Sequence, residues 1–141
     1  MSAAPRARIA GPRAWRAVEL AGSSDWIFAG PADLASRTPE QLDRWLEPLL
    51  RELHTGTGVA LVRGLGMLAE AELRGLFLAI GRRIGRPDNT YGELYEVTDQ
   101  GGCHRRQAIP VSQTHDTTTV HTDSSRRDTH PRWIGLACIR P

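Results

Sequence analysis

The chain of 141 residues contains no lysine, only two cysteines and no long apolar run. All 18 basic residues are arginine, which we attribute to a compositional bias. The net charge of +2 predicts no strong electrostatic attraction to nucleic acid or to membranes. Cys103 and Cys138 form no C-x-x-C pair and no disulfide framework, so we expect thiols in a reducing compartment. No segment approaches the roughly 20 apolar residues of a membrane span.

The N-terminal segment is rich in Ala, Pro and Arg and has no apolar h-region. We therefore expect no secretory signal and a cytoplasmic location. Residues 1–14 are predicted to form a loose tail, and residues 15–141 a single domain. With 40% hydrophobic and 24% charged residues, this domain has the composition of an ordinary globular protein.

Two segments carry the signals of helices. The first begins at Thr38, which suits the N-cap, because Pro39 follows at the first helical position and Gln41 completes a capping box. An apolar stripe continues it at helical spacing: Leu42, Trp45, Leu46, Leu49, Leu50 and Leu53. Pro48 is expected to kink this helix, and Gly56 and Gly58 to end it. A second helix is predicted from about Leu68 to Ile84, with Leu73, Leu76, Phe77, Ile80 and Ile84 on its inner face.

The remaining segments are predicted to be strands and loops, which gives an α+β class. Residues 15–28 indicate two short strands, or one strand and a loop. Further strands are predicted at 57–64, 93–97, 117–123 and 133–139, and polar loops at 99–112 and 124–130.

The triplet His121-Thr122-Asp123 is the main chemical signal. In an extended strand, residues two apart point to the same face, so an imidazole and a carboxylate are presented together. These are two of the three ligands of the 2-His-1-carboxylate facial triad, which binds non-haem Fe(II) in oxygenases. The alternative is a solvated His and Asp on a surface strand, and the spacing alone does not decide between the two.

The surrounding segments resemble a known family. The string from Val120 to Ser125, then Pro131 and the run from Ile134 to Pro141, is similar to the iron-binding region of TauD/TfdA-type Fe(II)/2-oxoglutarate dioxygenases, with the amino-acid hydroxylases related to clavaminate synthase as the nearest group. The strand-like segment 57–64 and the helix ending in Ile80-Gly81 and Ile84-Gly85 also resemble the family's N-terminal pattern. The resemblance covers residues 38–141.

This resemblance implies a fold and an activity. The fold would be the N-terminal part of a double-stranded β-helix, or jelly roll, with flanking helices, so residues 15–141 would be a partial, truncated dioxygenase domain. His121 and Asp123 would be the first two Fe(II) ligands, 2-oxoglutarate the cosubstrate and O2 the oxidant. The product would be a hydroxylated small molecule, an amino acid or a related metabolite. Asp123 argues against the halogenating relatives, in which a small residue stands at this position.

In the family, a distal His ligand and an Arg that pairs with 2-oxoglutarate lie on later strands, which would fall beyond Pro141. Within the chain, His130 and His115 are the candidates for a third ligand. Two alternatives to a dioxygenase stay open: a catalytically inactive remnant, and a small α+β binding module with at most weak metal binding. The oligomeric state is not predicted.

Other residues have less specific signals. Cys103-His104 lies in a Gly-rich loop and is more typical of an incidental pair than of a metal or thiol site. The loop Gln113-Thr114-His115-Asp116 is either solvated or a place of substrate contact. The Arg126-Arg127 pair is either solvated or binds an acidic substrate. The indole side chains of three residues are expected in the core rather than in ligand stacking: Trp26, Trp45 and Trp133.

Overall fold

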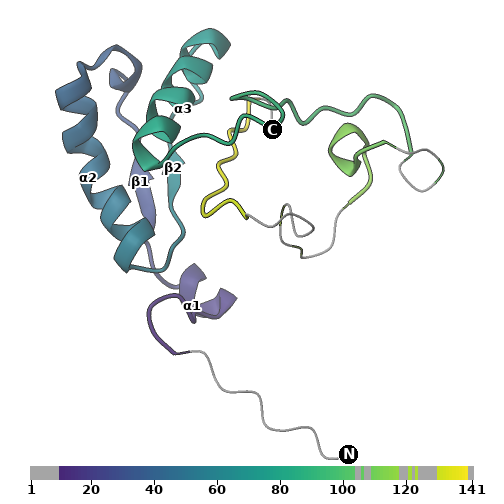
Figure 1. The fold of residues 1–141 in the computed structure, drawn as a ribbon. Helices are drawn as coiled ribbons and strands as arrows, with labels where there is room; N and C mark the ends of the chain where they lie inside the picture. The colour runs from purple at the N-terminus through teal and green to yellow at the C-terminus, as the bar shows by residue number, and fades with distance from the viewer. Residues whose placement is uncertain are drawn as a thin grey trace, which may run out of the picture. The chain divides into compact units, whose positions relative to one another are not determined.

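A computed structural model describes residues 10–103, 106, 109–117, 121, 123 and 130–139 (Figure 1). The chain divides into two compact units, Met1–Ile84 with Ala137–Pro141, and Gly85–Leu136. The elements follow in the order α1 (Ala17–Ala21), β1 (Ile27–Ala29), the 3-10 turn η1 (Leu34–Ser36), α2 (Pro39–Thr55), β2 (Leu61–Arg63), α3 (Glu70–Ile84) and the 3-10 turn η2 (Val111–Gln113). The predicted α+β class is confirmed for this described part.

The first unit is built on a parallel pair of strands. Ile27 lies opposite Leu61, and Ala29 opposite Arg63. Parallel strands need a crossover connection, which η1 and α2 provide here. Figure 1 shows the two strands side by side with α2 running alongside them.

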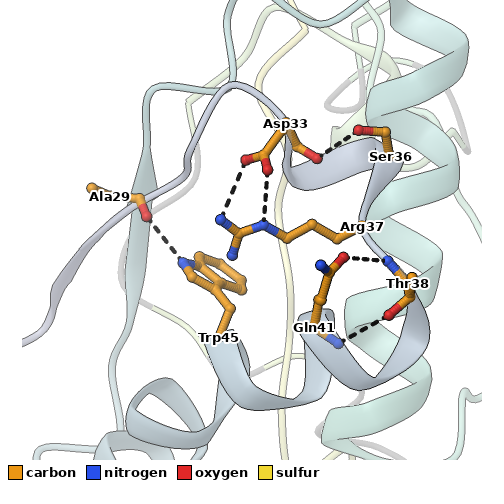
Figure 2. Close-up of polar contacts among 7 residues, drawn as sticks. All are labelled: Ala29, Asp33, Ser36, Arg37, Thr38, Gln41 and Trp45. Atoms are coloured by element: carbon orange, nitrogen blue, oxygen red, sulfur yellow. Dashed lines mark hydrogen bonds and ion pairs between the residues drawn. The ribbon is translucent and has the colours of Figure 1, made fainter.

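The start of α2 follows from its sequence, as Figure 2 shows. The Gln41 amide N–H donates to the Thr38 hydroxyl at 3.3 Å, and the Thr38 N–H donates to the Gln41 side chain at 2.9 Å. These two bonds satisfy N–H groups that have no partner within a helix, so the predicted capping box is confirmed. The Trp45 indole N–H donates to the Ala29 carbonyl at 3.1 Å, which ties α2 to the end of β1.

Leucine side chains form the core of the first unit. Seven of them are buried: Leu34, Leu42, Leu46, Leu49, Leu53, Leu73 and Leu76. Four belong to α2 and two to α3, in agreement with the predicted apolar faces, although Phe77, Ile80 and Ile84 are only half-buried. Asp43 of α2 and Arg83 of α3 form an ion pair beside this core. The two helices therefore pack through the leucine stripe that the spacing predicted.

The C-terminal end of α2 is closed by glycines and by an arginine from the N-terminal segment. The N–H groups of Gly56 and Gly58 both donate to the Glu52 carbonyl, at 3.0 and 3.2 Å. Gly58 has a φ of 80°, a conformation that favours glycine, so the predicted end of the helix is confirmed. The Arg13 guanidinium donates to the carbonyls of Leu53 and His54, each at 3.0 Å. Of the predicted tail, only residues 10–14 are described, and Arg13 is anchored there.

Pro48 lies inside α2, which continues through it to Thr55. Its ring is on the exposed side of the helix, and the expected kink stays a prediction.

Several strand predictions are wrong. The range 15–28 contains the beginning of one strand, β1, as one alternative predicted, but residues 17–21 form helix α1. The strand β2 covers only three residues of the predicted strand 57–64. Residues 93–97 and 133–139 are not strands, and Leu136 is 84% exposed. The physical reason is that an apolar, β-branched run becomes a strand only beside a hydrogen-bonded neighbour. In the described part, the two short strands pair with each other alone.

The predicted strand 117–123 falls largely on residues that the structure does not describe. Its described members, Thr117, His121 and Asp123, are not in a strand. The predicted loop 124–130 lies outside the described residues except for His130.

The described residues of the second unit are mostly irregular, with η2 and isolated bridges. The Gln100 N–H donates to the Gln113 carbonyl at 2.9 Å, and Gly102 forms a parallel bridge with Thr114. The polar segment predicted as a loop therefore folds back on the residues that precede His121. Of the helices that the structure describes, none is long and apolar enough to cross a membrane.

Candidate metal centre

His121 and Asp123 lie together in the second unit. The distance from His121 Nε2 to Asp123 Oδ1 is 3.4 Å. Both side chains line an open hollow of about 520 Å³, together with His130, Pro131 and Ile134. The two predicted ligands therefore share one surface, although the strand that was expected to align them is not seen at their positions.

Both side chains are accessible from solvent. The His121 side chain is 52% exposed and the Asp123 side chain 51%. An ion pair at such a site contributes little stability, because water and salt screen it. The contact between His121 and Asp123 therefore adds little to the stability of the fold.

The distance between the two donor atoms is compatible with one shared metal ion. Nitrogen and oxygen ligands bind a divalent ion such as zinc at about 2.0–2.2 Å, so two donors on one ion lie at most about 4.4 Å apart. The separation of 3.4 Å falls within this limit. An imidazole and a carboxylate are also the donor types that the Fe(II) facial triad uses. The two residues fit the ion as a pair of ligands.

A complete three-ligand site is not assembled in the described residues. Among them, no three His, Cys, Asp or Glu side chains are grouped closely enough to hold a metal ion. The two sequence candidates for the third ligand have separate locations. His130 lines the same hollow as His121 and Asp123, whereas His115 Nδ1 lies 3.5 Å from Asp99 Oδ2.

The loop before the candidate ligands is held by its own hydrogen bonds. The Thr114 hydroxyl donates to the Val111 carbonyl at 2.9 Å and accepts from the Asp116 N–H at 3.2 Å. The Gln113 amide donates to the Tyr95 hydroxyl at 3.3 Å. The possibility that this loop contacts substrate stays a prediction, and the contacts seen are internal to the second unit.

The structure assigns no binding role to the cysteines, the arginine pair or the tryptophans that the sequence analysis considered. Cys103 and Cys138 are not part of a disulfide, while His104 and Arg126-Arg127 lie outside the described residues. The three tryptophans expected in the core are half-buried: Trp26, Trp45 and Trp133. The indole N–H of Trp26 donates to the carbonyls of Leu20 and Ser23, at 2.9 and 3.0 Å, so this ring anchors backbone.

The sequence did not predict the contacts of three residues in this region. Pro131 and Ile134 line the hollow, and Asp99 pairs with His115. Pro131 and Ile134 are part of the string that resembles the iron-binding region, so their place in that string was the available signal. Asp99 is separated from His115 along the chain, and we find no sequence signal for that pairing.

A comparison with protein families gives one match that spans most of the chain. The family described as "Taurine catabolism dioxygenase TauD, TfdA family" matches residues 20–141. The chain belongs to this family. Neither the curated proteins nor the solved structures gave a match.

Membership confirms the resemblance drawn from the strings around His121 and residues 57–85. The family implies a jelly-roll dioxygenase fold and in general uses Fe(II) and 2-oxoglutarate. The described residues contain helices and one two-stranded sheet, so the double-stranded β-helix stays a prediction.

Proposed function

We propose that His121 and Asp123 bind Fe(II) in a 2-oxoglutarate-dependent dioxygenase that hydroxylates a small molecule, an amino acid or a related metabolite. One observation carries the proposal: an imidazole nitrogen and a carboxylate oxygen lie 3.4 Å apart on an open hollow, inside the segment that matches the dioxygenase family. Bound Fe(II), with 2-oxoglutarate and O2, would supply the oxidation of a C–H bond.

The chain's own residues have distinct tasks in this proposal. His121 offers a nitrogen lone pair, so it must be neutral to bind the ion, and metal binding competes with protons. Asp123 adds a negative charge that offsets part of the charge of the ion. Pro131 and Ile134 give the hollow an apolar side against which a small substrate can lie.

The proposal includes three expectations from the sequence. The chain is the N-terminal portion of the enzyme, it works in the cytoplasm, and its partners are a small molecule and O2 rather than nucleic acid or membrane. Reading the genomic frame that adjoins the coding segment tests the first of these. A continuing frame with a distal His and Arg would support it.

Metal binding tests the assignment directly. Anaerobic titration of the chain with Fe(II), followed by calorimetry, should show one site. His121→Ala and Asp123→Ala should each weaken the affinity for Fe(II) by about tenfold or more. Mutation of a residue that only hydrogen-bonds to a metal ligand already reduces metal affinity by about 10–100-fold, so loss of a ligand should cost at least as much. His54→Ala, an exposed histidine on α2, is the matched control and should bind as the original chain does. Unchanged affinity in His121→Ala would refute the metal assignment.

Turnover is a separate measurement. Among the described residues that line the hollow, there is no guanidinium to pair with the 2-oxoglutarate carboxylate. We therefore expect the chain by itself to form no succinate from 2-oxoglutarate when Fe(II) is added. Fe(II)-dependent succinate formation by the 141-residue chain would contradict this expectation and indicate a more complete site.

A further inference from the structure

The segment that precedes α1 is attached to the C-terminal end of α2. We infer that residues 11–15 form a strap that holds the connection between α2 and β2 in place, with Arg13 and Trp15 as its two points of attachment. The family match begins at residue 20, so the strap precedes the matched segment and the proposed function does not account for it. The strap and the connection both belong to the first unit.

A tight turn gives the strap its shape. The Ala14 N–H donates to the Gly11 carbonyl at 3.0 Å, which closes the turn. Pro12 stands at the second position of this turn, where its fixed φ is favourable. Gly11 has a φ of 113°, a conformation that favours glycine. The sequence of the strap is therefore suited to the conformation that brings Arg13 and Trp15 to the end of α2.

Arg13 binds the kind of acceptor that the end of a helix offers. The last carbonyls of a helix have no partner within it, and they form the negative end of the helix dipole. The Arg13 guanidinium donates to two of them, those of Leu53 and His54. The Arg13 side chain also lies over Gly58, where an added Cβ would be 3.6 Å from Arg13 Nε. One side chain therefore contacts both the last turn of α2 and the connection that follows it.

Trp15 binds the connection itself. Its indole N–H donates to the Thr57 carbonyl at 3.1 Å. The Thr57 N–H and hydroxyl both donate to the Glu52 carboxylate, at 2.8 and 2.6 Å. Thr57 is thus held by α2 through its donors and by the strap through its acceptor. Since β2 begins at Leu61, shortly after Thr57, the strap fixes the path of the chain into this strand.

The two attachments should act as one unit, because only Ala14 separates Arg13 from Trp15. When either side chain is released, the other must be held by a segment that has regained its freedom, which costs conformational entropy. Arg13 is exposed and Trp15 is 39% exposed, whereas the buried leucines lie elsewhere in the first unit. The strap can therefore open by itself while the leucine core stays folded.

Nuclear magnetic resonance of the indole N–H groups in the full chain shows the state of the strap. The four tryptophans give four indole signals, and the loss of one in Trp15→Phe identifies that of Trp15. Arg13→Ala should move the Trp15 signal toward the position of a solvent-exposed tryptophan. The indole signals of Trp26 and Trp45 should stay where they are, because these N–H groups donate to carbonyls outside the connection.

Amide hydrogen exchange measures how firmly the connection is held. Arg13→Ala should accelerate exchange in peptides covering residues 56–63 by about tenfold, because hydrogen bonds to a charged group are lost when the strap opens. Exchange in α3 should not change. Trp15→Phe keeps an aromatic ring without the N–H and should also accelerate exchange in residues 56–63. The double variant should exchange about as fast as Arg13→Ala alone, since both changes open the same strap.

Arg51→Ala is the matched control. Arg51 is an exposed arginine of α2, and its ion pair with Glu47 lies within the helix. It should leave the four indole signals and the exchange of residues 56–63 as they are in the original chain, because a surface pair of this kind contributes little.

Three results would overturn the inference. The first is an unchanged Trp15 indole signal in Arg13→Ala, which would show that Arg13 does not hold Trp15 in place. The second is unchanged exchange of residues 56–63 in Trp15→Phe, a mild change that tests the strap even if Arg13→Ala loses its fold. The third is a double variant in which the two accelerations multiply, because the contacts would then be independent. Equal acceleration in Arg51→Ala would also count against the strap.

Discussion

At the scale of single residues, His121 and Asp123 show what a short spacing along the chain can predict. The i, i+2 spacing of His121 and Asp123 predicted that the two side chains meet, and they lie 3.4 Å apart. The strand from which this was argued is not present at their described positions. Neighbours two apart can meet in several extended or turn conformations, so a short spacing predicts proximity better than it predicts secondary structure.

The two candidates for a third ligand, His115 and His130, show the limit of reasoning from residue types. Both are histidines near the proposed ligands along the chain. The folded chain distinguishes them, because His115 pairs with Asp99 of an earlier loop, whereas His130 lines the hollow. A pairing between loops leaves no periodic pattern, and therefore no signal that a single sequence can reveal.

Glu40 gives a prediction at this scale. Hydrogen bonding from the backbone at the start of α2, with a further contribution from the Thr38 hydroxyl, lowers the pKa of Glu40 below its ordinary value of 4.5. Because the folded pKa is the lower one, the ionised carboxylate stabilises the fold above the unfolded pKa. That contribution is lost as pH falls through the folded pKa.

The measurement is a carboxyl titration of Glu40 by nuclear magnetic resonance. We expect a midpoint below 4.5, and Thr38→Ala should move it back toward that value because one of its causes is removed. In Glu40→Gln, the free energy of unfolding should fall less steeply as the pH is lowered through the acid range. A midpoint at or above 4.5 in the original chain would contradict the role of the helix start.

At the scale of elements, the helices were predictable and the strands were not. Thr38, Gln41 and the leucine stripe of α2 are local signals, since a cap and an amphipathic face lie within one segment. Residues 133–139 have the composition of a strand but no neighbour in the described part of the chain. A strand forms only when its backbone pairs with a second segment, and the composition of one segment does not show whether such a partner is present.

The leucine stripe of α2 supports a prediction about stability. Leu46 is fully buried, with 0% of its surface exposed, so Leu46→Ala leaves a cavity in the core of the first unit. We expect a loss of about 2–5 kcal/mol in the free energy of unfolding, measured by urea denaturation. Leu136→Ala is the matched control, because Leu136 is 84% exposed and its truncation should cost little. Equal losses in the two variants would argue against the assigned core.

At the scale of the whole molecule, the described residues divide into two units of different construction. The buried hydrophobic side chains are all leucines of the first unit, from Leu34 to Leu76. In the second unit, the described residues are joined mainly by turns, by side-chain hydrogen bonds and by the Gln100–Gln113 backbone bond. Local stability follows buried apolar contacts, so the two units should open with different free energies.

Amide hydrogen exchange tests this difference. We expect peptides from α2 and the interior of α3 to be protected, and peptides covering residues 86–103 to exchange within the earliest time points. Leu46→Ala should reduce protection in α2 and leave the exchange of residues 86–103 as it was, because the core that it disturbs belongs to the first unit. Protection of residues 86–103 equal to that of α2 would show that the second unit is stabilised by more than the contacts described.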